Sequence, residues 1–235
     1  MLYTKVKGIY GYRRITLNLN RQHNTNYNVK RIHRLMKAAN LQSVIRRKRK
    51  TYIPSKPQII AENILARNFE ATQKNEKWLT DVTEFKYGDG QKAYLSAILD
   101  LGDRSIVSYV LGHSNNSALV FETLGFAMKD NPGARPLFHS DRGFQYTSNL
   151  FRAKLDLVGC RQSMSRVGRC IDNGPMEGFW GTLKSEMYYL KRFYTYDELQ
   201  QAIDEYIHFY NHERYQAKLN GLAPIEFRNQ PENVA

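Results

Sequence analysis

Apolar and polar positions alternate most regularly between residues 77 and 112, where the pattern predicts three strands. WLTDVTEF alternates, Asp89-Gly90 has the composition of a hairpin turn, and AYLSAILDL follows. A second turn at Gly102-Asp103 leads into SIVSYVLG. Three consecutive strands joined by short turns predict an antiparallel meander.

After this meander the period switches between helix and strand. SALVFETLGFAMKDN and TSNLFRAKLDLVG have helical spacing, PLFHSD and RQSMS are short strands, and a long helix begins near Pro175. The order βββαβαβα predicts an α/β fold, with a mixed sheet of three antiparallel strands plus parallel strands flanked by helices. Thr195 and Glu198 form a capping box that opens a last helix.

The N-terminal segment NVKRIHRLMKAANL predicts an amphipathic helix with one apolar and one basic face. The apolar positions are Val29, Ile32, Leu35, Met36 and Ala39. The opposite face carries Lys30, Arg31, Arg34 and Lys37. Arg13 and Arg14 precede this helix and are further candidates for phosphate contacts.

Charge separates this segment from the rest of the chain. Residues 1–57 contain fifteen Lys and Arg and no Asp or Glu, whereas the other 178 residues contain twenty basic and twenty-two acidic residues. The net charge of +13 therefore belongs to the N-terminal segment. Such charge without acidic partners indicates contact with a nucleic-acid backbone, although a solubilising or ribosomal-type arm has the same composition.

Composition also predicts domain boundaries. The run RRKRK, followed by Pro54 and Pro57, is typical of an extended, charged linker. The predicted units are a basic helical DNA-binding module at 1–45, a linker at 46–72, a catalytic core with its C-terminal helix at 73–228 and a tail at 229–235.

Membrane and disulfide classes of protein fit this chain poorly. Charges interrupt its apolar runs well short of a membrane span, and its N-terminus has no signal-peptide pattern. Its two cysteines, Cys160 and Cys170, are too few for a disulfide framework or a zinc ribbon. We expect a cytoplasmic protein associated with DNA.

Three carboxylates on three separate segments are candidates for a metal site. Asp81 shares a strand face with Leu79 and Phe85, where a carboxylate is costly unless it is paired or binds a cation. Asp141 ends a predicted strand, and Glu177 lies in the first turn of the long helix. Such a set suits Mg²⁺ or Mn²⁺, and two ions about 3.5–4 Å apart would assist in-line displacement at a phosphodiester. Spacing alone leaves this a hypothesis, because any enzyme of this size contains three acids.

The segments around these acids are more specific than the acids themselves. WLTDVTEF, HSDRGFQYTS, DNGPMEGFWGTLKSE and YNHERYQAKLNGLAPIEFR occur in order and at compatible spacing. Together they resemble the DDE transposases of bacterial insertion sequences, specifically the second-frame protein of elements whose transposase is made by frameshifting, within the retroviral-integrase superfamily. The resemblance extends from GIYGYRRI to about Arg228.

This resemblance implies a ribonuclease-H-like core with two divalent ions, Mg²⁺ or Mn²⁺. It implies that Asp81, Asp141 and Glu177 are the catalytic and metal-binding residues. Lys184, two turns after the glutamate, matches a position expected to contact the element's terminal DNA. The implied chemistry is DNA cleavage at the element's ends to leave a 3′-OH, followed by strand transfer through attack of that hydroxyl on a second phosphodiester.

The resemblance also implies partners. These are double-stranded DNA of the element ends and the target, further copies of the chain on DNA, and the first-frame protein of the same element. Relatives usually carry an upstream helix-turn-helix that recognises the ends, and this chain begins almost directly in the basic module, so we expect sequence-specific recognition to need that further unit. Two alternatives remain open: a nuclease that never joins DNA, and an incomplete transposase that acts only as a DNA-binding protein.

Other residues have structural interpretations beside functional ones. Asp172 or Asn173 is expected to cap the long helix, and Asp100 either to form a local ion pair with Arg104 or to have a role in the turn. His139 has two open interpretations. It is either a structural residue at the end of a strand, or a residue that adjusts the properties of Asp141 or touches DNA. Structural positions are expected for Phe179, Trp180, His208 and His212, the aromatic pair in the core and the histidines on a solvated face.

Overall fold

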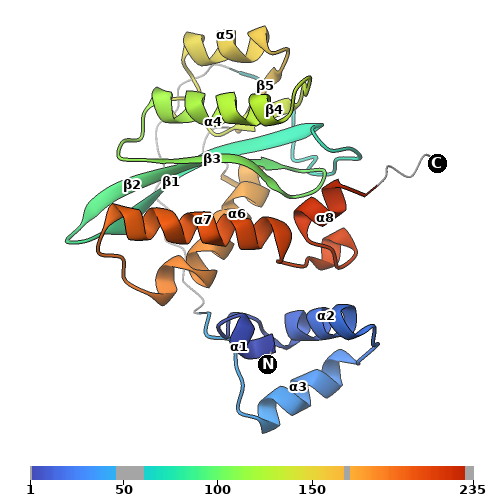
Figure 1. Ribbon diagram of the computed structural model, residues 1–235. Helices are drawn as coiled ribbons and strands as arrows, with labels where there is room; N and C mark the ends of the chain where they lie inside the picture. The colour runs from blue at the N-terminus through green and yellow to red at the C-terminus, as the bar shows by residue number, and fades with distance from the viewer. Residues whose placement is uncertain (1, 46–60, 167–169, 231–235) are drawn as a thin grey trace.

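A five-stranded mixed sheet organises the protein, whose computed structural model describes residues 2–45, 61–166 and 170–230 (Figure 1). The strands are β1 (Lys77–Tyr87), β2 (Gln91–Asp100), β3 (Ile106–Gly112), β4 (Leu137–Ser140) and β5 (Arg161–Met164). Their order is β3-β2-β1-β4-β5, antiparallel from β3 to β1 and parallel from β1 to β5. The predicted meander, the mixed sheet and the order βββαβαβα are confirmed.

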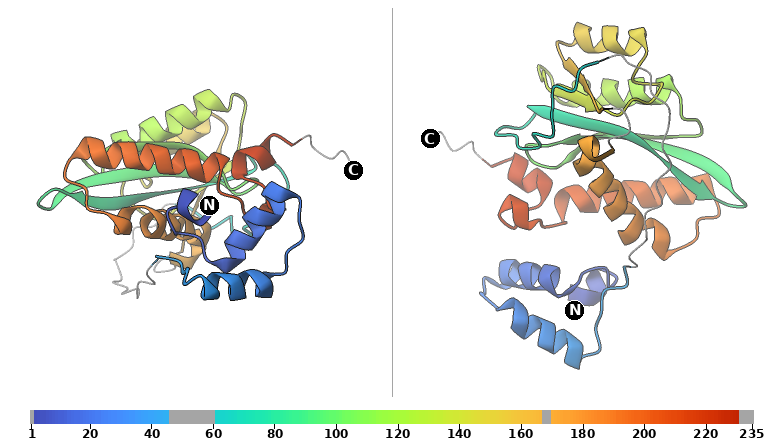
Figure 2. Two further views of the ribbon diagram at one scale, coloured as in Figure 1. Left: turned by 60° about the horizontal axis from the view of Figure 1, so that its bottom comes forward. Right: turned by 180° about the vertical axis from the view of Figure 1, so that it is seen from behind.

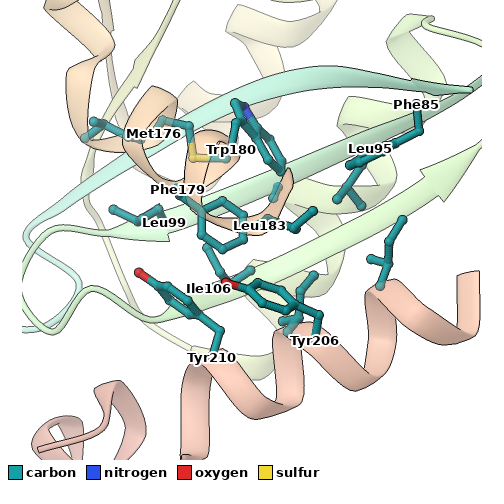
Figure 3. Close-up of a cluster of buried hydrophobic side chains, with 14 of the residues drawn as sticks. Phe85, Leu95, Leu99, Ile106, Met176, Phe179, Trp180, Leu183, Tyr206 and Tyr210 are labelled. Carbon is teal, nitrogen blue, oxygen red and sulfur yellow. The ribbon is translucent and has the colours of Figure 1, made fainter. Parts of the chain in front are cut away.

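Helices cover both faces of this sheet (Figure 1). The helices of the core are α4 (Ser117–Asp130), α5 (Asn149–Leu157), α6 (Gly174–Glu186), α7 (Tyr196–His212) and α8 (Pro224–Arg228). One apolar cluster joins α4 and α5 to Trp78 and Phe138 on one face. On the other face, Leu79 and Phe85 pack with α6 and α7, as Figure 3 shows for Phe85. Burial of both faces stabilises the sheet.

Helix starts follow the capping chemistry of the sequence with one exception. Ser148 accepts from Phe151 N, and the capping box of Thr195 and Glu198 is present, as predicted. Asn173 occupies the N-cap position of α6, but its side chain makes no capping bond. Asp172 does not cap the helix either, because its carboxylate binds Arg166. The predicted side-chain cap is therefore wrong, although the helix begins where expected.

The N-terminal module consists of three helices, α1 (Leu2–Lys5), α2 (Tyr12–His23) and α3 (Val29–Ala38). Ile32 and Met36 of α3 enter its small core. Val29 and Leu35 are 40% and 56% exposed, so the buried stripe of α3 is narrower than the sequence pattern predicts. A three-helix unit of this size has too little apolar surface to bury every periodic position.

This module packs beside the core below α7 and α8 (Figures 1 and 2). The rings of Tyr10 and Phe209 are 6.4 Å apart between centroids, and Arg14 Nη1 lies 3.7 Å from Glu186 Oε1. Of the predicted linker, residues 46–60 lie outside the described residues. Its later part packs on the core, since Leu65 is buried in the same cluster as Leu79. No helix in the described ranges combines the length and apolarity needed to cross a membrane.

Candidate active site

The parallel pairing of β1 and β4 brings Asp81 and Asp141 together. Leu79 of β1 lies opposite His139 of β4, and each aspartate follows two residues later. Because side chains of a strand repeat every second residue, both carboxylates leave the sheet on the side of their paired neighbours. The electrostatics agree with this proximity, because the charge of Asp141 raises the pKa of Asp81.

Helix α6 packs directly against this position. Trp180 Nε1 donates to Asp81 Oδ2 at 3.0 Å, and Val82 N donates to the other oxygen at 2.8 Å. Glu177 lies three residues before Trp180, in the first turn of α6. On the β4 side, Gly143 N donates to Asp141 Oδ1 at 2.8 Å. Hydrogen bonds therefore orient both aspartates without neutralising them.

Burial and mutual repulsion perturb the two aspartates. Burial, followed by the charge of Asp141 and then that of Glu177, raises the pKa of Asp81 to about 7, against hydrogen bonds from Val82 and Trp180 that lower it. Burial also raises the pKa of Asp141. Both residues keep part of their surface exposed. No basic side chain of the described residues forms an ion pair with either one.

These carboxylates fit a divalent cation by their donor chemistry. Two neighbouring carboxylates without a basic partner present hard oxygen donors and uncompensated negative charge, which is what Mg²⁺ or Mn²⁺ binds. Within the described ranges, no three His, Cys, Asp or Glu side chains are gathered closely enough to hold an ion together. Asp81 and Asp141 form the assembled pair, and Glu177 exerts the weakest of the effects on Asp81.

Lys184 lies against β1 beside this site. Its Nζ donates to Thr83 Oγ1 at 2.6 Å and to Glu84 O at 3.0 Å, and it stands 5.0 Å from the ring centroid of Phe85. These contacts place the ammonium group beside the part of β1 that directly follows Asp81. The predicted contact of Lys184 with DNA remains a prediction.

The candidate DNA-contacting residues of the module occupy two environments. Those whose side chains are exposed are Arg13, Lys30, Arg31, Arg34 and Lys37. Arg14 instead points to the core, 5.1 Å from the ring centroid of Tyr10 and close to Glu186. A pocket of about 900 Å³ is lined by α2 and the start of α3 and includes Tyr12 and His33, whose rings are 4.5 Å apart.

Other predicted positions have structural roles. Asp100 does not pair with Arg104: Arg228 Nη1 binds it at 2.9 Å, and Gly102 N donates to its other oxygen at 2.8 Å. The turn role of Asp100 is thus right and the local ion pair is wrong. His139 is fully buried between Ser163 and Ser165, and burial lowers its pKa to about 4. The buried Phe179 and Trp180 and the exposed His208 and His212 are as predicted.

Among the residues around the acids, Thr80 and Tyr146 were not singled out from the sequence, and Asn173 was expected only as a helix cap. Thr80 is buried beside Asp81, and Tyr146 and Asn173 both contact it. A signal was available, because Tyr146 lies within HSDRGFQYTS and Asn173 within DNGPMEGFWGTLK. Their polar atoms lie near the acids in the folded protein. The spacing of apolar and polar residues along the chain does not reveal this proximity.

Comparisons with known proteins identify the families and relatives that this chain resembles. Two models described as integrase core domain match residues 71–170 and 177–231, and one described as HTH-like domain matches residues 1–49. The InsK protein of insertion sequence element IS150 from Escherichia coli (strain K12) is 44% identical over 97% of this chain and 81% of its own length. A transposase for insertion sequence element IS904 from Lactococcus lactis is 35% identical over 94% of this chain and 88% of its own length.

Solved structures share the fold. The catalytic core domain of HTLV-2 integrase in complex with magnesium, at 19% identity, gives a TM-score of 0.52 over 66% of this chain and 97% of its own. A simian T-cell lymphotropic virus intasome bound to a PP2A regulatory subunit, at 16% identity, gives 0.60 over all of this chain and 75% of its own. The fold is that of ribonuclease-H-like integrase cores. The chain belongs to the family of insertion-sequence transposases that carry a retroviral-integrase-like core.

Proposed function

We propose that this chain cuts DNA at the ends of an insertion element and joins the cut ends to target DNA, using Asp81, Asp141 and Glu177 as its catalytic acids. The observation that carries the proposal is the side-by-side placement of Asp81 and Asp141 without a basic partner in the described ranges. Two repelling carboxylates on one sheet edge cost stability unless they bind a cation. Family membership supports a polynucleotidyl transferase.

Each acid has a distinct proposed part in holding divalent ions, Mg²⁺ or Mn²⁺, of which the family resemblance implies two. Asp81, oriented by Trp180, and Asp141, oriented by Gly143 N, are the paired ligands. Glu177 is the third ligand, supplied by the first turn of α6. Bound ions would supply positive charge that favours deprotonation of an attacking hydroxyl and stabilises the leaving oxygen. Lys184, against β1, would contact the phosphates of the element's terminal DNA.

The basic module is the proposed DNA-binding unit. Its exposed cations, among them Lys30, Arg31 and Arg34 on α3, face away from the buried Ile32 and Met36. Contacts of this kind supply affinity through release of counterions from the phosphate backbone. We propose the division into a module at 1–45, a linker at 46–72, a core at 73–228 and a tail at 229–235. Proposed partners are element and target DNA, further copies of the chain and the first-frame protein of the element.

A gel assay with labelled DNA carrying the source element's end tests the function. The wild-type chain is expected to give nicked and joined products with Mg²⁺ or Mn²⁺, and Glu177→Gln is expected to give neither. Nicks that never lead to joined products would show a nuclease. DNA binding without cleavage by the wild-type chain would contradict the proposed activity and favour a DNA-binding role alone.

A further inference from the structure

Thr80, the residue before Asp81, contacts both of the other segments that carry proposed catalytic acids. It is buried, and its Oγ1 donates to Ala97 O of β2 at 3.0 Å. This bond uses the only hydrogen of the hydroxyl. The phenol oxygen of Tyr146 lies 3.2 Å from the same Oγ1, so Tyr146 is the donor in that pair.

Tyr146 belongs to the loop that carries Asp141, five residues earlier. It is fully buried, and its ring packs edge-on against Phe151 with the centroids 5.6 Å apart. Its N–H donates to Gly143 O at 3.0 Å, which closes the loop behind Asp141. Burial and the charges of Asp81 and Asp141 raise the pKa of Tyr146 well above its ordinary value, so the phenol remains a donor. The loop of Asp141 is thereby tied to β1 beside Asp81.

Asn173 ties the segment of Glu177 to the same residue. Asn173 stands four residues before Glu177 and is only 3% exposed, and its Nδ2 donates to Thr80 O at 3.1 Å. An asparagine at an N-cap ordinarily accepts an N–H of the first turn, which contributes about 1 kcal/mol to a helix. Asn173 gives up that bond, and its Oδ1 has no partner in the described part of the chain. The side chain is therefore committed to β1 and not to its own helix.

We propose that Tyr146 and Asn173 are positioning residues of the metal site, which through Thr80 hold the segments of Asp141 and Glu177 beside Asp81, so that the three carboxylates need only a small movement to close on a divalent ion. This inference rests on the proposed function. Partners behind metal ligands commonly change metal affinity or activity by about 10–100-fold when they are removed. Neither residue need touch an ion, because each acts by fixing the backbone that presents a carboxylate.

The chain offers matched controls for a merely structural role. Tyr206 is also buried, and its hydroxyl donates to Glu186 Oε2 at 2.9 Å, at the opposite end of α6 from Glu177. Asn211 is a helix asparagine whose Nδ2 donates to a strand carbonyl, Ile106 O, at 2.9 Å. Tyr206→Phe and Asn211→Ser thus remove the same kinds of hydrogen bond without reaching Thr80.

The test titrates Mn²⁺ into the full-length chain and follows binding by electron paramagnetic resonance, together with thermal melting. Tyr146→Phe removes one hydroxyl, and Asn173→Ser keeps a capping side chain that is too short to reach Thr80. Each is expected to raise the Kd for Mn²⁺ by about 10-fold or more. The Mg²⁺ concentration for half-maximal cleavage is expected to rise in parallel. Tyr206→Phe and Asn211→Ser are expected to lower the melting temperature by a similar amount and to leave the Kd unchanged.

Two results would overturn the inference: Kd values in Tyr146→Phe and Asn173→Ser that change no more than in the controls, or a wild-type chain that binds no Mn²⁺. The proposed function fails separately. If the wild-type chain binds Mn²⁺ but does not cut element DNA, or if Asp141→Asn still cuts it, the function is wrong while the Mn²⁺ titrations still decide the positioning roles.

Discussion

Two groups of buried carboxylates in this protein differ in what balances their charge. Glu186 receives two hydrogen bonds from Arg214, at 2.7 and 2.8 Å, and Asp172 is bound by Arg166 and Arg67. The Arg166 guanidinium holds the pKa of Asp172 well below its usual range. Asp100 and Asp103 share Arg228, although burial and the charge of Asp103 still raise the pKa of Asp100. Except for Arg166 with Asp172, these pairs join segments far apart in the sequence.

Asp81 and Asp141 form the contrasting group. They have hydrogen bonds from N–H groups, no cationic partner in the described ranges, and raised pKa values. A fold that pairs its fully buried acids with arginine leaves these two partly exposed acids uncompensated, at a cost to stability. The difference teaches that buried charge by itself does not mark a functional site in this chain. We propose that charge which the fold leaves unbalanced does.

The largest expected effect is on catalysis. Asp141→Asn removes one proposed ligand, and the loss of several kcal/mol of transition-state stabilisation corresponds to a fall in cleavage rate of about 10³-fold. Because the change also removes repulsion with Asp81, thermal stability without metal is expected to stay equal or rise. Asp156→Asn, on an exposed position of α5, is the control for both measurements. A clear loss of thermal stability in Asp141→Asn would place Asp141 with the structural acids.

The second effect concerns stability. Arg214→Met leaves Glu186 buried without the two hydrogen bonds from Arg214, with only Tyr206 and the more distant Arg14 as partners, and breaking such a pair costs about 3–5 kcal/mol of unfolding free energy. Urea denaturation measures the change. Arg192→Met, which removes an exposed pair with Asp89 at 3.8 Å, is expected to change stability little. If both substitutions changed the unfolding free energy equally, the arginine partner of Glu186 would not stabilise the fold, and the contrast between acids paired with arginine and the Asp81–Asp141 pair would be lost.

The third effect is a pH dependence. The pKa of Asp81 is raised to about 7 from an ordinary value near 4, so between those limits the folded state binds more protons than the unfolded state. Without metal, Asp81 therefore makes the protein less stable as pH rises from about 4 to about 7. Mg²⁺ binds the ionised form, so its stabilising effect is expected to grow through the same window.

Melting temperatures with and without Mg²⁺, measured in the wild type and in Asp81→Asn, check this dependence. His139 acts in the opposite sense, because its pKa is lowered to about 4 and its contribution is lost as pH falls below about 6.5. That part is expected to persist in Asp81→Asn. A wild-type increment with Mg²⁺ that is flat from pH 5 to pH 8 would contradict the assignment.

The smallest effect is on DNA affinity. Arg31→Ala and Arg34→Ala are each expected to reduce the slope of log affinity against log salt by about 1, because each removes a phosphate contact. Binding by fluorescence anisotropy at several salt concentrations measures it. The Mn²⁺ affinity of the core should remain as in the wild type, and an unchanged salt slope would move the DNA surface away from α3.

The local pattern of apolar and polar residues is what made much of the fold predictable from the sequence. Alternation and helical period specify the order of elements, and the pairing of β1 with β4 then brings Asp81 and Asp141 together. Contacts between distant segments were beyond such reasoning. Arg228 reaches Asp100 across 128 positions, and Asn173 donates to Thr80 O while accepting no hydrogen bond from its own helix, because tertiary packing decides which partners lie within reach. Arg14 likewise lies in a basic segment of the sequence, which suggested DNA contact, but in the folded protein it contacts Glu186.

That contact of Arg14 has a mechanical consequence. Its Nη1 is enclosed at 3.7 Å from Glu186, which lies at the end of α6, the helix whose first turn carries Glu177. The Arg14 guanidinium cannot move away from Glu186 unless water hydrates both charged groups again. The N-terminal module therefore cannot move away from α6, the helix that carries Glu177, unless Arg14 and Glu186 first separate.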